Sequence, residues 1–374
     1  MRATQLPGLN LLRVLASLYM VMFHLHPSFL PGPVAVFFSR GASDTSLFFI
    51  LSGFLLAHLY AGKTAGDAAQ KRFVWRRMAR IFPANVVGLL FLLGVQALLG
   101  STAVNWNTLS ECLLLVQTWV VGNEHAMNIP AWSMSCLLFF YLIFPVVLPR
   151  LERLKTQTLQ VTLLCLWVLG AVALPELARW PGGLDPSDWV QHMHTSPLLR
   201  SAEFVLGMGV AVLVARRGRP PVWWFRCSVP VILGLLLLAP GETMAVNNGL
   251  FAPFTVMLLL AFVNPGPLFE RLGNSAPVRT LASACICIFL LHMTWINLFN
   301  GWVLPHLHLE WNLWTLGAYL LLVLASSVLV DRFVCQPLSR LLTRPLMIRR
   351  PARPLQPSAT PAPAQAKALI VQGV

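Results

Sequence analysis

The chain has 374 residues, of which 57% are hydrophobic and 11% are charged, and its mean hydropathy is +0.69. Soluble domains typically carry about 25% charged residues, so this composition excludes an ordinary soluble protein and predicts a polytopic membrane protein. The formal net charge is +14. Its basic residues lie in short loops between apolar runs, which is the positive-inside pattern of membrane proteins and predicts no nucleic-acid partner.

About ten apolar segments are candidates for membrane helices, because about 20 apolar residues are needed to cross a bilayer. The predicted fold class is all-α, a polytopic membrane helical bundle of about ten transmembrane helices. The first segment is expected to be a retained helix rather than a cleaved signal peptide. The segments centre on residues 9–27, 44–60, 79–99, 132–149, 158–174, 198–215, 223–238, 249–263, 281–300 and 313–333.

Alternate loops between these segments carry the lysines and arginines. The positive-inside rule therefore places both termini in the cytoplasm, in agreement with an even number of spans. Residues 1–345 are expected to form one membrane domain, and the Pro- and Ala-rich residues 346–374 a disordered cytoplasmic tail. The seven cysteines contain no CxxC pair, so neither a metal site nor a disulfide framework is predicted.

Arg13 and His24 lie in the first apolar segment with no carboxylate nearby in the sequence. Eleven helical residues separate them by about 16 Å and place them on nearly the same face. Ionisable groups within membrane helices are expensive and usually functional, and an imidazole exchanges protons near neutral pH. Alternatively, Arg13 is a snorkelling anchor and His24 a hydrogen-bonded packing residue.

Further polar groups follow in chain order. Each group also has a purely structural explanation. These are close helix approach for the small residues of 46–53, which accounts for Gly53, topogenic charge for the arginines, a mutual ion pair for Arg200 with Glu203, and a structural role for His292. Guanidinium groups also suit phosphates. The candidate site residues are Ser46 and Ser52 in one segment, Arg76, Arg77 and Arg80 before the next, then Trp132, Ser133, Arg200, Glu203 and His292.

In combination and in this order, these motifs resemble the acyltransferase 3 family of integral-membrane O-acyltransferases, which includes bacterial polysaccharide O-acetyltransferases. The resemblance rests on Arg-x10-His (13–24), SLFFILSGF (46–54), RRMARIFP (76–83), the WS…FY…P pattern (132–145), R..EF..GM (200–208) and an ending at His292. The chain departs from the family pattern at Leu137, where the family has Glu, at CICIFLLH (285–292), and at Cys335, where the family has the Glu of E-x-P.

The resemblance implies transfer of an acetyl group from cytoplasmic acetyl-CoA, a substrate rather than a permanently bound cofactor, to a sugar hydroxyl. The implied acceptor is an exopolysaccharide or other cell-envelope glycan, as a lipid-linked repeat unit, and the implied location is the bacterial inner membrane. His24 would be the general base or form an acetyl-histidine, with Arg13 stabilising donor or developing charge. Arg76, Arg77 and Arg80 would hold the CoA phosphates.

The other candidates would have supporting roles. Ser46 and Ser52 could orient the thioester or the imidazole, while Trp132, Ser133, Arg200, Glu203 and His292 would support the acceptor side. With Leu137 apolar, Asp44 or a backbone carbonyl could orient His24. Other glycan-assembly membrane proteins are possible partners. The alternatives are a transporter or flippase for a lipid-linked sugar, a catalytically dead scaffold, and an O-acyltransferase for a non-glycan small molecule.

Overall fold

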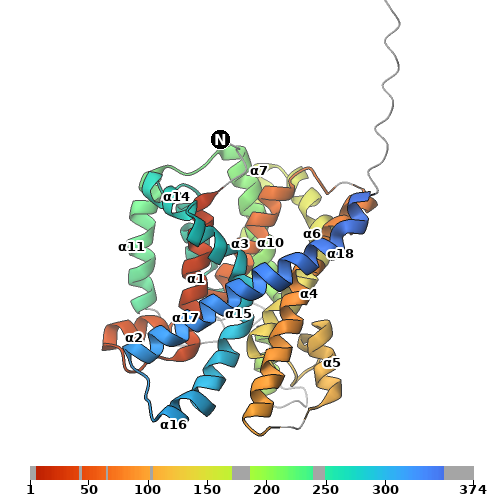
Figure 1. Cartoon of the computed structure of the whole chain (residues 1–374). Helices are drawn as coiled ribbons and strands as arrows, with labels where there is room; N and C mark the ends of the chain where they lie inside the picture. Colours follow the sequence, from red (N-terminus) through yellow and green to blue (C-terminus); the bar gives the residue numbers. More distant parts are fainter. Residues whose placement is uncertain are drawn as a thin grey trace, which may run out of the picture.

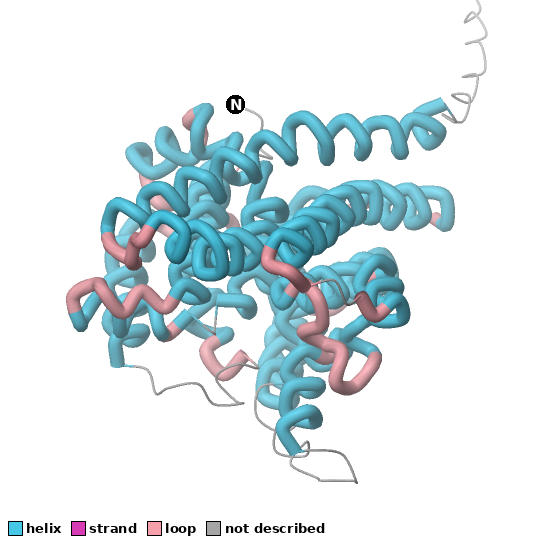
Figure 2. The backbone as a smooth tube through the Cα atoms, turned by 60° about the horizontal axis from the view of Figure 1, so that its bottom comes forward, coloured by secondary structure: helices cyan, strands magenta, loops and turns pink. Residues whose placement is uncertain are grey.

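A computed structural model describes residues 6–41, 44–64, 66–101, 104–170, 186–238 and 249–348. Within these ranges the side chains of residues 44, 186–188, 235–238 and 345–348 are not described. Helices and their connections make up all of these residues, with no strand among them (Figure 2). The all-α prediction is confirmed for the described part of the chain.

Each of the ten predicted segments coincides with an apolar helix. Additional short helices lie between them. In chain order the helices are α1 (Pro7–Leu25), α2 (Gly32–Ser39), α3 (Asp44–Tyr60), α4 (Asp67–Leu98), α5 (Trp106–Leu114), α6 (Trp132–Arg153), α7 (Thr156–Val168), α9 (Pro186–Thr195), α10 (Pro197–Arg217), α11 (Val222–Leu238), α13 (Ala252–Val263), α14 (Pro267–Gly273), α15 (Ala276–Leu298), α16 (Leu304–Leu307), α17 (Leu313–Val330) and α18 (Gln336–Ile348).

By length and composition, the described residues bear out fewer than the expected ten or so spans. Among the described residues, 6 helices are long and apolar enough to cross a membrane, or 7 if the bent pair α13 and α14 forms one span. That pair bends by 92°, at the helix-breaking sequence Asn264-Pro265-Gly266-Pro267. Helices α3, α7 and α11 are the three remaining predicted segments, and their described apolar parts have only 10–17 residues.

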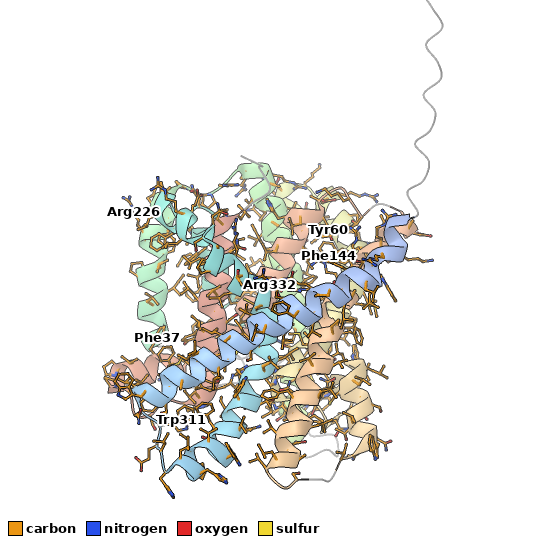
Figure 3. The ribbon with its side chains drawn as sticks, in the orientation of Figure 1. Phe37, Tyr60, Phe144, Arg226, Trp311 and Arg332 are labelled. Carbon is orange, nitrogen blue, oxygen red and sulfur yellow. The ribbon has the colours of Figure 1, made fainter. Side chains whose placement is uncertain are left out.

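The helices run alternately between two ends of the molecule (Figure 1). One end, here called the α14 end, holds α14, the start of α1 and the end of α18. The other, here called the α16 end, holds α16, α5 and α2. Arg226 lies at the α14 end, whereas Phe37 and Trp311 lie toward the α16 end (Figure 3). With this alternation the basic loops predicted from the sequence gather at the α14 end.

Helices α3 and α10 form the closest helix crossing near the centre of the bundle. A side chain at Gly53 would collide with the carbonyl oxygen of Phe204, and one at Gly207 with that of Ile50. Two glycines thus let the helix backbones touch, as small residues do in membrane bundles. Gly53 has the packing role that its sequence position allows. The stacked rings of Phe140 and Phe204, with centroids 4.8 Å apart, continue the contact toward α6.

The last described helix crosses the predicted domain boundary. A π-helical turn, Asp331–Cys335, joins α17 to α18, and the two form one long rod across the face of the bundle in Figure 1. Helix α18 packs against α4, where the indole of Trp75 donates a hydrogen bond to the carbonyl of Leu342 at 2.8 Å. The rod continues to Ile348. The predicted tail lies outside the described residues from position 349 onward.

Candidate functional site

A cavity of about 590 Å³ lies between α1, α3, α4, α6 and α15. Its wall from α3 runs from Thr45 to Leu59, nearly the full length of that helix. Four arginines line it, and none of the described lining residues is Asp or Glu. The arginines are Arg13, Arg77, Arg80 and Arg279. The cavity therefore suits an anionic ligand with a long apolar or amide arm.

Arg77 is held over the cavity by two aromatic rings. Its guanidinium lies 5.2 Å from the ring centroid of Tyr60 and 5.7 Å from that of Phe73, and it donates a hydrogen bond to the Tyr60 hydroxyl at 3.1 Å. The Nε atom of Arg77 is buried, with no hydrogen-bond partner in the described part of the chain. A guanidinium that is positioned but not saturated is ready to bind a phosphate.

Arg80 is instead paired within the protein. Its guanidinium lies 2.8 Å from Asp331 and donates a hydrogen bond to the carbonyl of Ser283 at 2.6 Å. The second oxygen of Asp331 accepts hydrogen bonds from the Ser283 hydroxyl at 2.7 Å and the Gln336 amide at 2.8 Å. Asp331 stands one turn before Cys335, the position at which the resembling family carries Glu. Asp331, which the sequence analysis did not single out, therefore supplies a carboxylate close in the sequence to the position where the family has Glu.

Only some of the other residues predicted to bind the donor line the cavity. Arg13, assigned near the cytoplasmic mouth, lines the cavity, whereas Arg76 does not. Arg279, at the start of α15, lines the cavity and was not predicted. Its side chain donates to the amide oxygen of Asn274 at 3.4 Å. In the sequence Arg279 is one of many loop arginines, and no local pattern distinguishes it.

His24 and His292 form a pair that joins α1 to α15. The Nδ1 atom of His24 lies 3.2 Å from Nε2 of His292 and 3.1 Å from the carbonyl oxygen of Met20. Nδ1 of His292 in turn lies 3.2 Å from the carbonyl oxygen of Ile288. The backbone carbonyl that was expected as one possible support of His24 is therefore present. The side chain of Asp44, the other possibility, lies outside the described residues.

These contacts determine which nitrogens carry protons in a neutral pair, because a neutral imidazole has one N–H donor and one bare nitrogen. A carbonyl can only accept, so Nδ1 of His292 carries a proton and its Nε2 accepts one from Nδ1 of His24. Nε2 of His24 is then the bare nitrogen. The side chain is partly exposed, and Nε2 has no hydrogen-bond partner among the described residues. This nitrogen can serve as a general base.

Neither histidine lines the cavity. Phe289 is the last residue of α15 that lines the cavity, and its ring centroid is 6.0 Å from that of His292 and 6.0 Å from that of Phe48. Both phenylalanines line the cavity. The cavity and the imidazole pair are therefore adjacent, about one helical turn apart on α15, with a layer of aromatic rings between them.

The remaining candidates fall into two groups. Ser52 and Ser133 line the cavity, as does Leu137. Ser46, Arg200, Glu203 and Trp132 do not, because they form a separate buried cluster between α3, α6 and α10. Neither Ser46 nor Ser52 is hydrogen-bonded to His24 in the described structure. No contact therefore supports a role for these two serines in orienting the imidazole.

That buried cluster is an ion pair with its supports. Arg200 lies 3.1 Å from Glu203, and the other oxygen of Glu203 accepts a hydrogen bond from the Ser46 hydroxyl at 2.7 Å. The guanidinium also lies over the rings of Phe49 and Trp132, at 5.2 and 5.9 Å. This is the mutual pairing that the sequence allowed as the structural alternative, and it ties α10 to α3 and α6.

Comparison with known proteins agrees with this architecture. The family model described as an acyltransferase domain, Acyl_transf_3, matches residues 6–332. Acyltransferase MdmB of Streptomyces mycarofaciens is 29% identical over 96% of this chain and 97% of its own length. A Staphylococcus aureus (strain COL) protein that carries the name O-acetyltransferase SACOL0978 is 28% identical over 39% of this chain and 25% of its own length.

A Bacillus subtilis (strain 168) protein that carries the name peptidoglycan O-acetyltransferase YrhL is 23% identical over 77% of this chain and 48% of its own length. No solved structure matches the chain significantly. The family model covers most of the helical bundle, including the cationic cavity and the histidine pair. The chain therefore belongs to the acyltransferase 3 family, and it is a multi-pass membrane O-acyltransferase.

Proposed function

We propose that this enzyme transfers an acetyl group from cytoplasmic acetyl-CoA to a sugar hydroxyl of an exopolysaccharide or other cell-envelope glycan, carried as a lipid-linked repeat unit. The α14 end, with the basic loops and both described chain ends, faces the cytoplasm in this proposal. The observation that carries it is a cationic cavity whose lining on α15 ends at Phe289, about one helical turn from His292, which contacts the histidine with a bare ring nitrogen, His24.

The donor site is the arginine-lined cavity. Arg77 and Arg279 bind the CoA phosphates, because their guanidinium groups face the cavity without a carboxylate partner in the described structure. Arg80 contributes less charge, since Asp331 neutralises it, and it holds the cavity wall. The pantetheine arm then follows α3 and α15 toward Phe289, and Arg13 stabilises negative charge on the bound donor.

The acceptor approaches from the α16 end. Nε2 of His24 removes the proton from the sugar hydroxyl as its oxygen attacks the thioester carbonyl. The C–S bond breaks, and the proton passes from His24 to the departing thiolate of CoA. His292 and the Met20 carbonyl hold the His24 ring with Nδ1 protonated throughout. The chemistry needs no permanently bound cofactor.

The decisive experiment compares His24→Ala with His306→Ala, a matched change at an exposed histidine near the α16 end that contacts only Trp302 in the described structure. We expect His24→Ala to abolish acetylation of the cell-surface glycan while the protein stays inserted and binds acetyl-CoA. His306→Ala should acetylate normally. Retained acetylation by His24→Ala would overturn the assignment of the base.

The same strains test the class of acceptor. Mass spectrometry of surface glycans and of small secreted molecules should show the mass of one acetyl group lost from the glycan in deletion and His24→Ala strains. A non-glycan acceptor is the second candidate, since the relative that matches this chain over nearly all of both lengths is named only as an acyltransferase. Loss of the acetyl mass from a small molecule, with unchanged glycan, would identify that candidate.

A further inference from the structure

Two aromatic rings line the donor cavity on the side of the histidine pair. Phe48 from α3 and Phe289 from α15 line it, and their rings meet edge to face with centroids 6.0 Å apart. Phe289 is 8% exposed, so its ring is fixed among neighbours rather than free in the cavity. The lining continues to Thr45 and Ser133, so this ring pair is not the end of the cavity but the part of its wall that contacts the histidine pair.

The imidazole pair stands directly behind this wall. His292 follows Phe289 by three residues on α15, which places both on one face of the helix about 4.5 Å apart along its axis. The two rings have centroids 6.0 Å apart, and His292 lies 3.2 Å from His24. One side chain, Phe289, thus contacts both the donor cavity and the acid–base pair.

We propose that Phe289, closed against Phe48, separates the bound thioester from His24 and from water until an acceptor is in place, and so makes the enzyme a transferase rather than a thioesterase. This inference rests on the proposed function. It makes Phe289 a positioning residue that determines which nucleophile reaches the thioester.

The chemistry explains why such a separation matters. The bare Nε2 of His24 can deprotonate water as readily as a sugar hydroxyl. Attack by water would break the C–S bond and form a C–O bond to water, releasing acetate, free CoA thiol and no acylated product. An aqueous path to the acceptor side would therefore waste the donor continuously, and exclusion of water from the thioester suppresses this side reaction.

The experiment uses the full chain, purified and reconstituted in lipid nanodiscs, with acetyl-CoA as the probe. Release of CoA thiol without acceptor measures hydrolysis, acetate in the same samples identifies its product, and equilibrium binding of acetyl-CoA reports the donor site. We expect Phe289→Ala to raise acceptor-independent thiol release at least tenfold per molecule of bound acetyl-CoA, which the binding measurement determines for each variant. Phe289→Leu, which keeps most of the side-chain volume, should raise it much less.

Phe225→Ala is the matched control. Phe225 is 9% exposed and packs on Phe262 and Phe269, away from the cavity lining, so its loss removes a buried ring without opening the wall. Its thiol release should equal that of the wild type. Phe48→Ala approaches the same wall from α3 and should also raise hydrolysis, which keeps the test valid if Phe289→Ala does not fold.

The possible outcomes distinguish a failure of the role assigned to Phe289 from a failure of the proposed function. Wild-type hydrolysis in folded Phe289→Ala and Phe48→Ala, with normal His24-dependent transfer, would overturn the role of Phe289 and leave the proposed function intact. Failure of the wild type to bind or consume acetyl-CoA would overturn the proposed function itself. The double variant Phe289→Ala with His24→Ala should hydrolyse less than Phe289→Ala alone, because the proton acceptor is then missing. Equal hydrolysis by both would contradict the proposal that the wall separates the donor from this base.

Discussion

Replacing His292 by Leu removes one of the two acceptors that hold the Nδ1 proton of His24, at 3.2 Å, and leaves the other, the Met20 carbonyl at 3.1 Å. A net hydrogen bond is worth about 0.5–1.5 kcal/mol. Since about 1.4 kcal/mol corresponds to a tenfold rate change, we expect kcat to fall about 2- to 13-fold. Loss of a general base typically costs about 10²–10⁴-fold, so His24→Ala should be far more damaging.

The measurement is kcat for acetyl transfer in detergent or nanodiscs, at saturating acetyl-CoA. His292→Gln is the informative companion, because its amide oxygen can accept the Nδ1 proton of His24, and we expect it to retain more activity than His292→Leu. The unfolding midpoint of each variant shows whether the fold has been preserved. If folded His292→Leu is as inactive as His24→Ala, then His292 takes part in proton transfer directly and does not merely orient His24.

Three further predictions concern stability, each measured as the thermal unfolding of purified protein in detergent. Asp331→Ala should cost about 1–3 kcal/mol, because it leaves the mostly buried guanidinium of Arg80 without its counter-charge; an unchanged midpoint would contradict this. Glu203→Ala should cost up to about 3–5 kcal/mol, because it removes the carboxylate paired with the buried guanidinium of Arg200. Arg200→Met with Glu203→Leu should be much milder, and equal losses would refute the importance of this pair. Burial lowers the pKa of His125, in the loop before α6, so stability should fall as pH drops below about 6.5. His125→Asn should flatten that loss, and an identical pH profile would count against it.

Hydropathy predicted the positions of the helices because the apolar runs are long and the basic loops regular. It did not predict the true extent of every helix. Helix α4 begins at Asp67, well before the predicted segment at 79–99, because its first turns are charged and invisible to a search for apolar residues. The break between α13 and α14 was visible as two prolines and a glycine, but the sequence cannot show how far the chain bends there.

Individual residues of the site could be predicted from the sequence, but the contacts between them could not. Arg13 and His24 share a helix face, as their spacing indicates, yet only the fold shows that one lines the cavity and the other lies beyond its end. The partner of His24 is 268 residues away in the sequence, so no local pattern could reveal it. Ser46 and Ser52, six residues apart, point about 120° apart on a helix, and a common role for them could have been doubted from the sequence alone.

The touching glycines of α3 and α10 have a mechanical consequence. At Gly53 and Gly207 the carbonyl oxygen of one helix packs directly on the Cα atom of the other, so no side chain lies between the two helices that could adjust as they slide. The buried ion pair of Arg200 and Glu203 holds the same two helices together at a second place. The α3 side of the donor cavity is therefore rigid. An opening that lets CoA in must therefore come from the other helices around the cavity, α1, α4, α6 and α15. Because α1 and α15 also carry the two imidazoles, a movement of these two helices would couple the entry of a substrate to the alignment of the base.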